Sequence, residues 1–123
     1  MKSLTKAEEQ VMLVLWRLGK GFLKDVVDAT SEPRPHPNTV ATLLKILVEK
    51  GFVDFDVQGR NNCYRPLISK TVYGKTTANQ LVKGYFEGSP AKLISQFVSD
   101  KTVSLQELEE LLQQIRSAKK SKP

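Results

Sequence analysis

The chain has 123 residues, of which 40% are hydrophobic and 26% are charged, with a formal net charge of +6 at pH 7 and one cysteine. This length predicts one domain, or a small domain with an appended oligomerisation arm. The single cysteine, Cys63, excludes an intrachain disulfide and a multi-cysteine metal site. The longest apolar run, residues 11–16, is too short to span a membrane. The N-terminus lacks the cleavage site of a signal peptide, so we expect a cytoplasmic protein.

The positive charge favours an anionic partner, although solubility alone would also explain it. Residues 1–66 contain ten Lys and Arg against eight Asp and Glu, whereas residues 67–123 contain nine against five. Much of the excess lies in the last residues, Lys119, Lys120 and Lys122. The charge therefore supports nucleic-acid binding only together with other features.

A T-x-x-E pattern at Thr5 and Glu8 predicts the start of the first helix, because each side chain can accept a hydrogen bond from the other residue's backbone N–H. Apolar residues follow with helical spacing until two glycines end the helix. Phe22 to Thr30 is predicted as a short second helix. In residues 31–37 proline recurs at every second position, which predicts a stiff, extended connector.

Residues 37–51 carry the most informative pattern in the chain. Their apolar side chains fall at positions i, i+3, i+4, i+7 and i+8, which predicts a helix with one buried face. These side chains are Val40, Leu43, Leu44, Leu47 and Val48. His36, the only histidine, stands at the N-cap position and is interpreted as a loop residue. Pro37 suits the first helical turn, and Gly51 suits the left-handed residue after the helix end.

The opposite face of this helix carries short amide and hydroxyl groups and one lysine, which can reach base edges and phosphates. The candidate DNA-binding residues on it are Asn38, Thr39, Thr42, Lys45 and Ile46. Ile46 has no hydrogen-bonding capacity, so it either packs against a thymine methyl group or belongs to the core. Most amphipathic helices have a solvated side without a ligand, so this face is informative only together with its neighbours.

A hairpin is predicted after the third helix. Residues 52–57 alternate with period two, residues 58–62 are rich in turn formers, and residues 63–66 can return as a second strand. Three helices followed by a hairpin are the layout of a winged helix-turn-helix domain. In that layout the third helix enters the major groove and the wing contacts the DNA backbone or minor groove. Arg60, near the hairpin tip, is therefore the sixth candidate DNA-binding residue.

The rest of the chain is predicted to be helical. Ser69 caps a segment that runs to about Phe86, Ser89 caps the next, and Ser104 with Glu107 forms a second capping box. Amphipathic helices that follow a complete winged unit need somewhere to bury their apolar faces, and a two-fold dimer is the commonest solution. The candidate dimerisation residues are Leu81, Tyr85, Leu93, Ile94, Phe97, Leu105, Leu108 and Leu112.

The sequence predicts a mainly α fold with a small β-hairpin wing. We expect a winged-helix DNA-binding domain at residues 1–67, a helical dimerisation domain at residues 68–117 and a basic disordered tail at residues 118–123. The sequence has no phosphate-binding glycine loop, no paired histidines and no nucleophile with plausible partners. We therefore expect no catalytic residues, no metal site and no cofactor.

Several stretches carry a resemblance to a known family. They are Leu4-Thr5-Lys6-Ala7-Glu8 with Val11, Leu15 and Trp16, Thr39 to Gly51, Gly59-Arg60, Tyr64-x-Pro66-Leu67, and Gly88-Ser89-Pro90 before a terminal acidic-leucine helix. In these stretches, and over almost its whole length, the chain resembles the penicillinase-repressor and methicillin-resistance-regulator family. The resemblance implies a homodimeric repressor that binds a double-stranded DNA operator. It also implies a membrane sensor-transducer, a protease partner that triggers cleavage of the repressor in the C-terminal domain. The cleavage point of the family maps to Gln96-Phe97 in this sequence.

Some residues depart from the family's pattern. Ala41 and Ile46 stand where polar or basic residues are usual, Asp54 and Asp56 add acidic charge to the wing, and His36 replaces the usual serine cap. These departures bear on which operator is bound and how tightly. A copper-responsive branch of the family carries a C-terminal cysteine pattern that this sequence lacks, which argues against metal sensing.

Three functions remain for comparison. The leading hypothesis is a homodimeric transcriptional repressor on a palindromic operator. The alternative is a winged-helix module for protein–protein interaction without DNA readout, because the third helix carries little phosphate-directed charge. A small enzyme is the least supported, since no convergent catalytic set is present.

Overall fold

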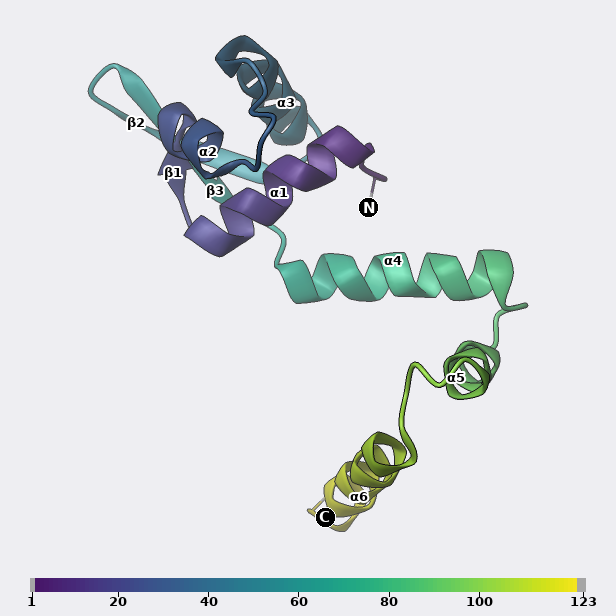
Figure 1. Cartoon of the computed structure of the whole chain (residues 1–123). Coiled ribbons are helices and arrows are strands. Elements are labelled where there is room, and N and C mark those ends of the chain that lie inside the picture. The colour runs from purple at the N-terminus through teal and green to yellow at the C-terminus, as the bar shows by residue number, and fades with distance from the viewer. Residues whose placement is uncertain (1, 122–123) are drawn as a thin grey trace. The chain divides into compact units, whose positions relative to one another are not determined.

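The computed structural model describes residues 2–121, without the side chains of residues 119–121 (Figure 1). It is mostly helical with one small antiparallel sheet, as the sequence predicted. The elements, in chain order, are α1 (Lys6–Leu18), β1 (Gly21–Phe22), α2 (Leu23–Ala29), α3 (Pro37–Glu49), β2 (Val53–Gln58), β3 (Asn61–Pro66), α4 (Lys70–Tyr85), α5 (Pro90–Ser99) and α6 (Leu105–Ser121). The chain divides into two compact units, Met1–Lys75 and Thr76–Pro123.

The predicted capping box starts α1. The Glu8 N–H donates to the Thr5 hydroxyl, and the Thr5 N–H donates to the Glu8 carboxylate, both at 3.2 Å. At the other end Gly19 has a φ of 83°, and its N–H closes the last turn on the Leu15 carbonyl at 2.7 Å. A positive φ strains residues that have a Cβ, so a glycine suits this position.

The hydrophobic core of the first unit lies between α1, α2, α3 and the start of β2. Its fully buried side chains are Met12, Leu15, Val26, Val40, Leu44, Leu47, Phe52 and Val53. Burying a side chain of this size contributes about 1.5–3 kcal/mol. Three members of the predicted α3 stripe belong to this set, and Leu43 and Val48 pack against it. The prediction of a helix with one buried face is therefore confirmed.

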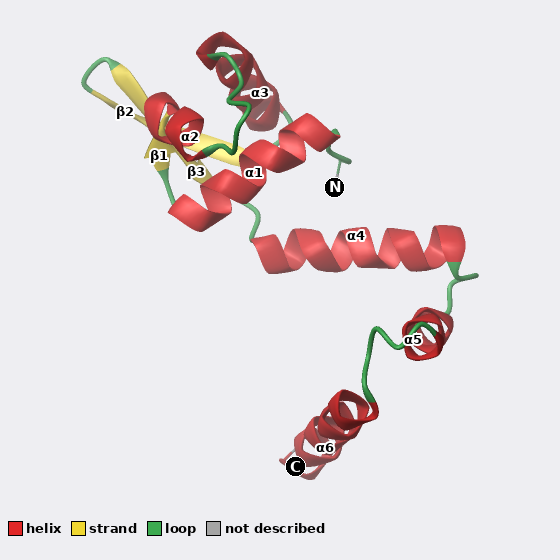
Figure 2. Cartoon of the chain, viewed as in Figure 1, coloured by secondary structure: helices red, strands yellow, loops and turns green. Residues whose placement is uncertain are grey.

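The sheet has three strands in the order β1-β3-β2 (Figure 2). The sequence predicted the β2–β3 hairpin but not β1, in which Gly21 pairs with Tyr64 and Phe22 pairs with Cys63. A two-residue strand has no alternating pattern by which it could be predicted. Gly21 is buried, and a Cβ on it would lie 3.2 Å from the Asp25 Cβ, so the position favours glycine.

The hairpin has a shorter loop than predicted. Gln58 pairs with Asn61, so both strands extend into the expected turn segment and only Gly59 and Arg60 remain as the loop. Gly59 has a φ of 66°. Two-residue hairpin loops favour turn types with positive φ, because the twist of these turns matches that of the strands. Glycine adopts a positive φ without strain.

The first turn of α4 belongs to the first unit. Ser69 caps this helix as predicted, accepting from the Val72 N–H at 3.1 Å. The indole N–H of Trp16 donates to the Ile68 carbonyl at 2.8 Å, and the ring of Tyr73 packs edge-on against Phe52 at a centroid distance of 5.6 Å. These contacts explain why the division between the units falls after Lys75, inside α4, whereas we expected a boundary at residues 67–68.

The second unit contains the remainder of α4, α5 and α6. Ser89 caps α5, and Ser104 and Glu107 form the predicted capping box at the start of α6. In the part of this unit whose side chains are described, Val82 alone is buried. The expected basic tail at residues 118–123 begins inside α6, which continues to Ser121, and its last two residues lie outside the described part. No helix within the described residues is long and apolar enough to cross a membrane.

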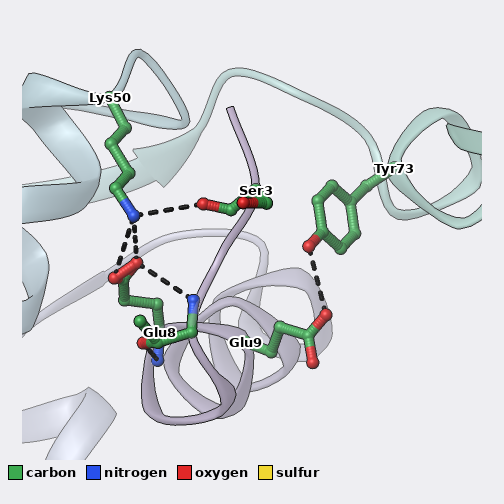
Figure 3. A network of polar contacts seen from close by, with 6 residues as sticks. Ser3, Glu8, Glu9, Lys50 and Tyr73 are labelled. Carbon is green, nitrogen blue, oxygen red and sulfur yellow. Dashed lines mark hydrogen bonds and ion pairs between the residues drawn. The ribbon is translucent and has the colours of Figure 1, made fainter. Parts of the chain in front are cut away.

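A polar network joins the start of α1 to the end of α3 (Figure 3). Glu8 is 2% exposed, and Lys50, the C-cap residue of α3, donates to both of its carboxylate oxygens. The Lys50 ammonium also donates to the Ser3 carbonyl at 3.1 Å. Burial by itself raises the pKa of Glu8, but the hydrogen bonds from Lys50 and Thr5 and the charge of Lys50 lower it by more. The pKa of Glu8 therefore lies below its usual value.

Replacing Glu8 by glutamine should lower the free energy of unfolding at pH 7 by about 1–3 kcal/mol, because the partly buried Lys50 loses its charged partner. The pKa of Glu8 is lower in the folded chain than in the unfolded chain, where it is about 4.3. The stabilisation by Glu8 is therefore present above that pH and is lost as the pH falls through the folded value. Urea unfolding should separate wild type from Glu8→Gln at pH 7 and bring the two together in acid.

The matched control is Glu49→Gln, which neutralises an exposed carboxylate on α3 and should change the free energy by less than about 0.5 kcal/mol. A stability difference between wild type and Glu8→Gln that stays constant from pH 7 to acid would contradict this assignment.

Candidate nucleic-acid interface

The N-terminal end of α3 is open to an anionic ligand. The Nδ1 atom of His36 accepts a hydrogen bond from the Asn38 N–H at 3.0 Å, which confirms His36 as the N-cap. The first turn of α3 carries no acidic residue. The partial positive charge of a helix N-terminus favours phosphate, and here no carboxylate in that turn opposes it.

The predicted DNA-binding residues on α3 differ in their exposure to solvent. Asn38, Thr39, Thr42 and Lys45 are exposed, whereas Ile46 is half-buried. The Thr42 hydroxyl donates to the Asn38 carbonyl at 3.0 Å, which fixes its rotamer and leaves its oxygen able to accept a further hydrogen bond. Ile46 is therefore partly a packing residue, and only the rest of its side chain is available to a ligand.

Asn38, Thr42 and Lys45 follow one another at positions i, i+4 and i+7, so they lie in one row along the helix. At a rise of 1.5 Å per residue this row is about 10 Å long. Successive base pairs of B-DNA are about 3.4 Å apart, so a row of this length spans about three of them. The exposed face of α3 is thus long enough for direct readout of a short sequence in a major groove.

The acidic residues of the wing are paired with an arginine within the hairpin. Arg65 on β3 faces Asp54 on β2, and their side chains form an ion pair at 3.1 Å. The Arg65 Nε also lies 3.5 Å from an Asp56 carboxylate oxygen. Since one arginine offsets part of the charge of both aspartates, the wing repels phosphates less than its sequence suggested.

Arg60 occupies the second position of the β2–β3 loop and is exposed. Among the described residues neither the Arg60 guanidinium nor the Lys45 ammonium has a hydrogen-bond or ion-pair partner. In the view of Figure 1 the loop and α3 both extend beyond α1 at the upper edge of the first unit. Both cations of the candidate set are therefore free to contact DNA.

Two contacts that shape this surface were missed from the sequence. Lys50 forms an ion pair with Glu8, and this pair holds the end of α3. The pairing of Arg65 with Asp54 could have been found from the hairpin register, because the register places them opposite each other. The pairing of Lys50 with Glu8 had no such signal, since these residues are 42 positions apart.

The predicted dimerisation residues all belong to the second unit. Leu93 and Leu108 are half-buried, and the other six are exposed. The six are Leu81 and Tyr85 on α4, Ile94 and Phe97 on α5, and Leu105 and Leu112 on α6. The Gln96-Phe97 bond lies within α5, where the Gln96 amide donates to Asp100 at 3.0 Å.

Comparisons with known proteins identify the family to which the sequence is similar. A family model described as penicillinase repressor matches residues 4–117. The penicillinase repressor of Bacillus licheniformis is 25% identical over 120 residues, which cover 97% of this chain and 94% of that protein. The methicillin resistance regulatory protein MecI of Mammaliicoccus sciuri is 25% identical over 109 residues, which cover 88% of this chain and 89% of that protein.

A solved structure supports the fold. It is that of BpsR from Bordetella bronchiseptica, a protein whose DNA binding is regulated by 6-hydroxynicotinic acid. The two structures have a TM-score of 0.50 and 19% sequence identity, over 94% of this chain and 75% of that chain. At this identity the likeness concerns the fold alone.

Replacing Thr42 by valine or Asn38 by alanine should relax base preference, at a cost of about 1–3 kcal/mol for each good hydrogen bond to a base that is removed. Replacing Arg60 by alanine should instead weaken binding to all sequences alike and reduce the salt slope by about one phosphate contact. Fluorescence anisotropy with a panel of duplexes at several salt concentrations measures both effects. If a folded Asn38-Thr42-Lys45 triple alanine variant binds its preferred duplex as wild type does, α3 is not the DNA-reading element.

Proposed function

Because the chain belongs to the penicillinase repressor family, a family of DNA-binding transcriptional repressors, we propose that it acts as a homodimer on a palindromic operator. Each subunit reads one half-site with α3 and contacts the DNA backbone with Arg60. The observation that carries the proposal is the exposed face of α3, where Asn38, Thr42 and Lys45 form a polar row on the side opposite the buried Val40, Leu44 and Leu47.

This surface favours DNA over a protein partner. Its exposed residues are short polar groups and a free lysine, whereas protein interfaces are centred on buried aromatic and aliphatic anchors. The one aliphatic side chain in the proposed contact set, Ile46, is half-buried in its own domain. A winged helix used only for protein contacts is therefore less well supported than DNA binding.

The second unit supports assembly with another copy of the chain. Large apolar side chains on its helices are exposed to solvent, among them Leu105 at 72% and Ile115 at 55% on α6. An amphipathic helix normally buries its apolar stripe, and a two-fold interface would bury the stripes of two copies at once. Half-sites would then lie about one helical turn, or a multiple of it, apart on the operator.

Release of repression is proposed to occur by cleavage at Gln96-Phe97 by a membrane sensor protease, with the repressor itself in the cytoplasm. Proteases bind extended chains, so α5 would have to unwind locally. This helix contains no buried residue in the part of the chain described, so its opening costs little packing energy. The cut would separate Leu105, Leu108 and Leu112 from the winged unit.

The experiment that tests the proposed function is a gel shift with duplex DNA from the region upstream of the chain's own gene, repeated at rising salt. Binding through phosphates must weaken steeply with salt, because each neutralised phosphate releases counterions. A repressor shifts this DNA in preference to a shuffled duplex. Absence of any shift at low salt would favour the protein-interaction module.

Replacing Leu112 by glutamate should weaken the dimer, because a charge would then enter the apolar interface. The change should lower operator affinity by a factor of about 10²–10⁴, the gain that linking two binding units provides. Glutamate and leucine have similar helix propensities, so α6 should persist. Sedimentation and anisotropy measure the two effects, and Gln113→Glu, the adjacent residue off the stripe, is the matched control that should leave both unchanged. A full-length monomer at concentrations that saturate the operator would contradict the assembly.

Mass spectrometry of the repressor from derepressed cells should detect fragments 1–96 and 97–123, since separating α6 from the winged unit removes the gain from linkage. Cells grown without the inducing treatment provide the control and should contain the intact chain. An intact 123-residue chain under full derepression would mean that release occurs by another route.

A further inference from the structure

We propose that Tyr73 is a positioning residue for DNA readout, which acts on α3 through the first turn of α1. Tyr73 does not belong to the row formed by Asn38, Thr42 and Lys45. The inference rests on the proposed function and adds to it a determinant of sequence specificity. Two neighbouring carboxylates, Glu8 and Glu9, connect the elements (Figure 3).

Tyr73 is held on several sides. Its hydroxyl donates to the Glu9 carboxylate at 3.1 Å. Its ring lies 5.9 Å from that of Trp16 and 5.6 Å from that of Phe52, the latter in an edge-on arrangement. Since the two ring contacts do not involve the hydroxyl, the bond to Glu9 can be removed without emptying the core.

The hydrogen bond of Tyr73 to Glu9 and its ring contact with Phe52 both connect it to residues that hold the C-terminal end of α3. Glu9 follows Glu8, whose carboxylate binds the Lys50 ammonium at the C-cap of α3. Phe52 is fully buried, and its N–H donates to the Leu47 carbonyl at 3.0 Å, in the last turn of α3. Tyr73 therefore supports the end of α3 by one polar route and one apolar route.

The position of the C-terminal end of α3 affects the tilt of the helix and so the position of Asn38 at its N-terminal end. The 13 residues of α3 give it a length of about 20 Å. Over that length a tilt of about 3° displaces the Asn38 end by about 1 Å, and hydrogen bonds weaken beyond about 3.2 Å. Base contacts should be sensitive to such a tilt, whereas contacts of flexible lysines and arginines with phosphates should not.

The test compares full-length wild type with Tyr73→Phe. The probe is the duplex enriched from a randomised library by wild type, and the reference is a shuffled duplex of the same composition. We expect the ratio of the two affinities to fall about 3- to 10-fold, as for the removal of one hydrogen bond. Affinity for the shuffled duplex and the dimer mass in sedimentation should remain as in wild type.

Glu9→Gln should reduce the ratio in the same way, and the double variant with Tyr73→Phe should add little to either single change, because both act on one contact. Asp28→Asn is the matched control, since it removes an exposed carboxylate and changes the net charge equally. That control should keep the wild-type ratio, which separates positioning from a general charge effect.

Three results would overturn the inference. The first is an unchanged ratio in folded Tyr73→Phe while wild type still prefers the enriched duplex, which leaves the proposed function intact. The second is an equal decrease in affinity for both duplexes, or unfolding of both single variants, which would assign these contacts to stability alone. The third is failure of wild type to enrich any sequence, which removes the proposed function and this inference with it.

Discussion

The ion pair between the buried Glu8 and the partly buried Lys50 is the constraint on which the placement of α3 depends. A carboxylate that is 2% exposed is stable only when charged and hydrogen-bonding partners replace its water. Lys50 provides the charge, and the N–H of Thr5 adds a hydrogen bond. Because removal of either charge leaves the other uncompensated, the start of α1 and the end of α3 remain together. The apolar stripe of α3 attaches the helix to the core, and this pair fixes its end.

Because the apolar stripe and the Glu8–Lys50 pair hold α3 in place, the exposed face of the helix is not needed for the fold. Core packing comes from Val40, Leu44 and Leu47, and none of the exposed polar groups is needed for it. Within the wing the same separation holds, since Arg65 offsets the aspartates and Arg60 in the loop remains available. The exposed polar groups on α3 and Arg60 in the loop can therefore be substituted without loss of the fold. Under the proposed function, substitutions on this face would be one way to change the operator that is bound.

Local signals predicted much of the fold, and contacts between distant residues explain what was missed. The capping residues Thr5, Ser69 and Ser104 and the stripe of α3 were readable because each depends on neighbours within a few positions. Strand β1 was missed because it exists only through its pairing with β3. The end of the first unit inside α4 depends on Tyr73 packing against Phe52, which no local pattern reports. The six candidate DNA-binding residues were nameable from spacing, whereas the half-burial of Ile46 required the tertiary structure.

The proposed function depends above all on α3 and the wing loop forming the DNA-binding surface. Amide chemical-shift mapping of the full-length, ¹⁵N-labelled protein during titration with the enriched duplex tests this most directly. We predict that the largest shifts fall on residues 38–46 and on Gly59 and Arg60. Shifts concentrated on α5 and α6, with those of residues 38–46 unchanged at saturation, would contradict it.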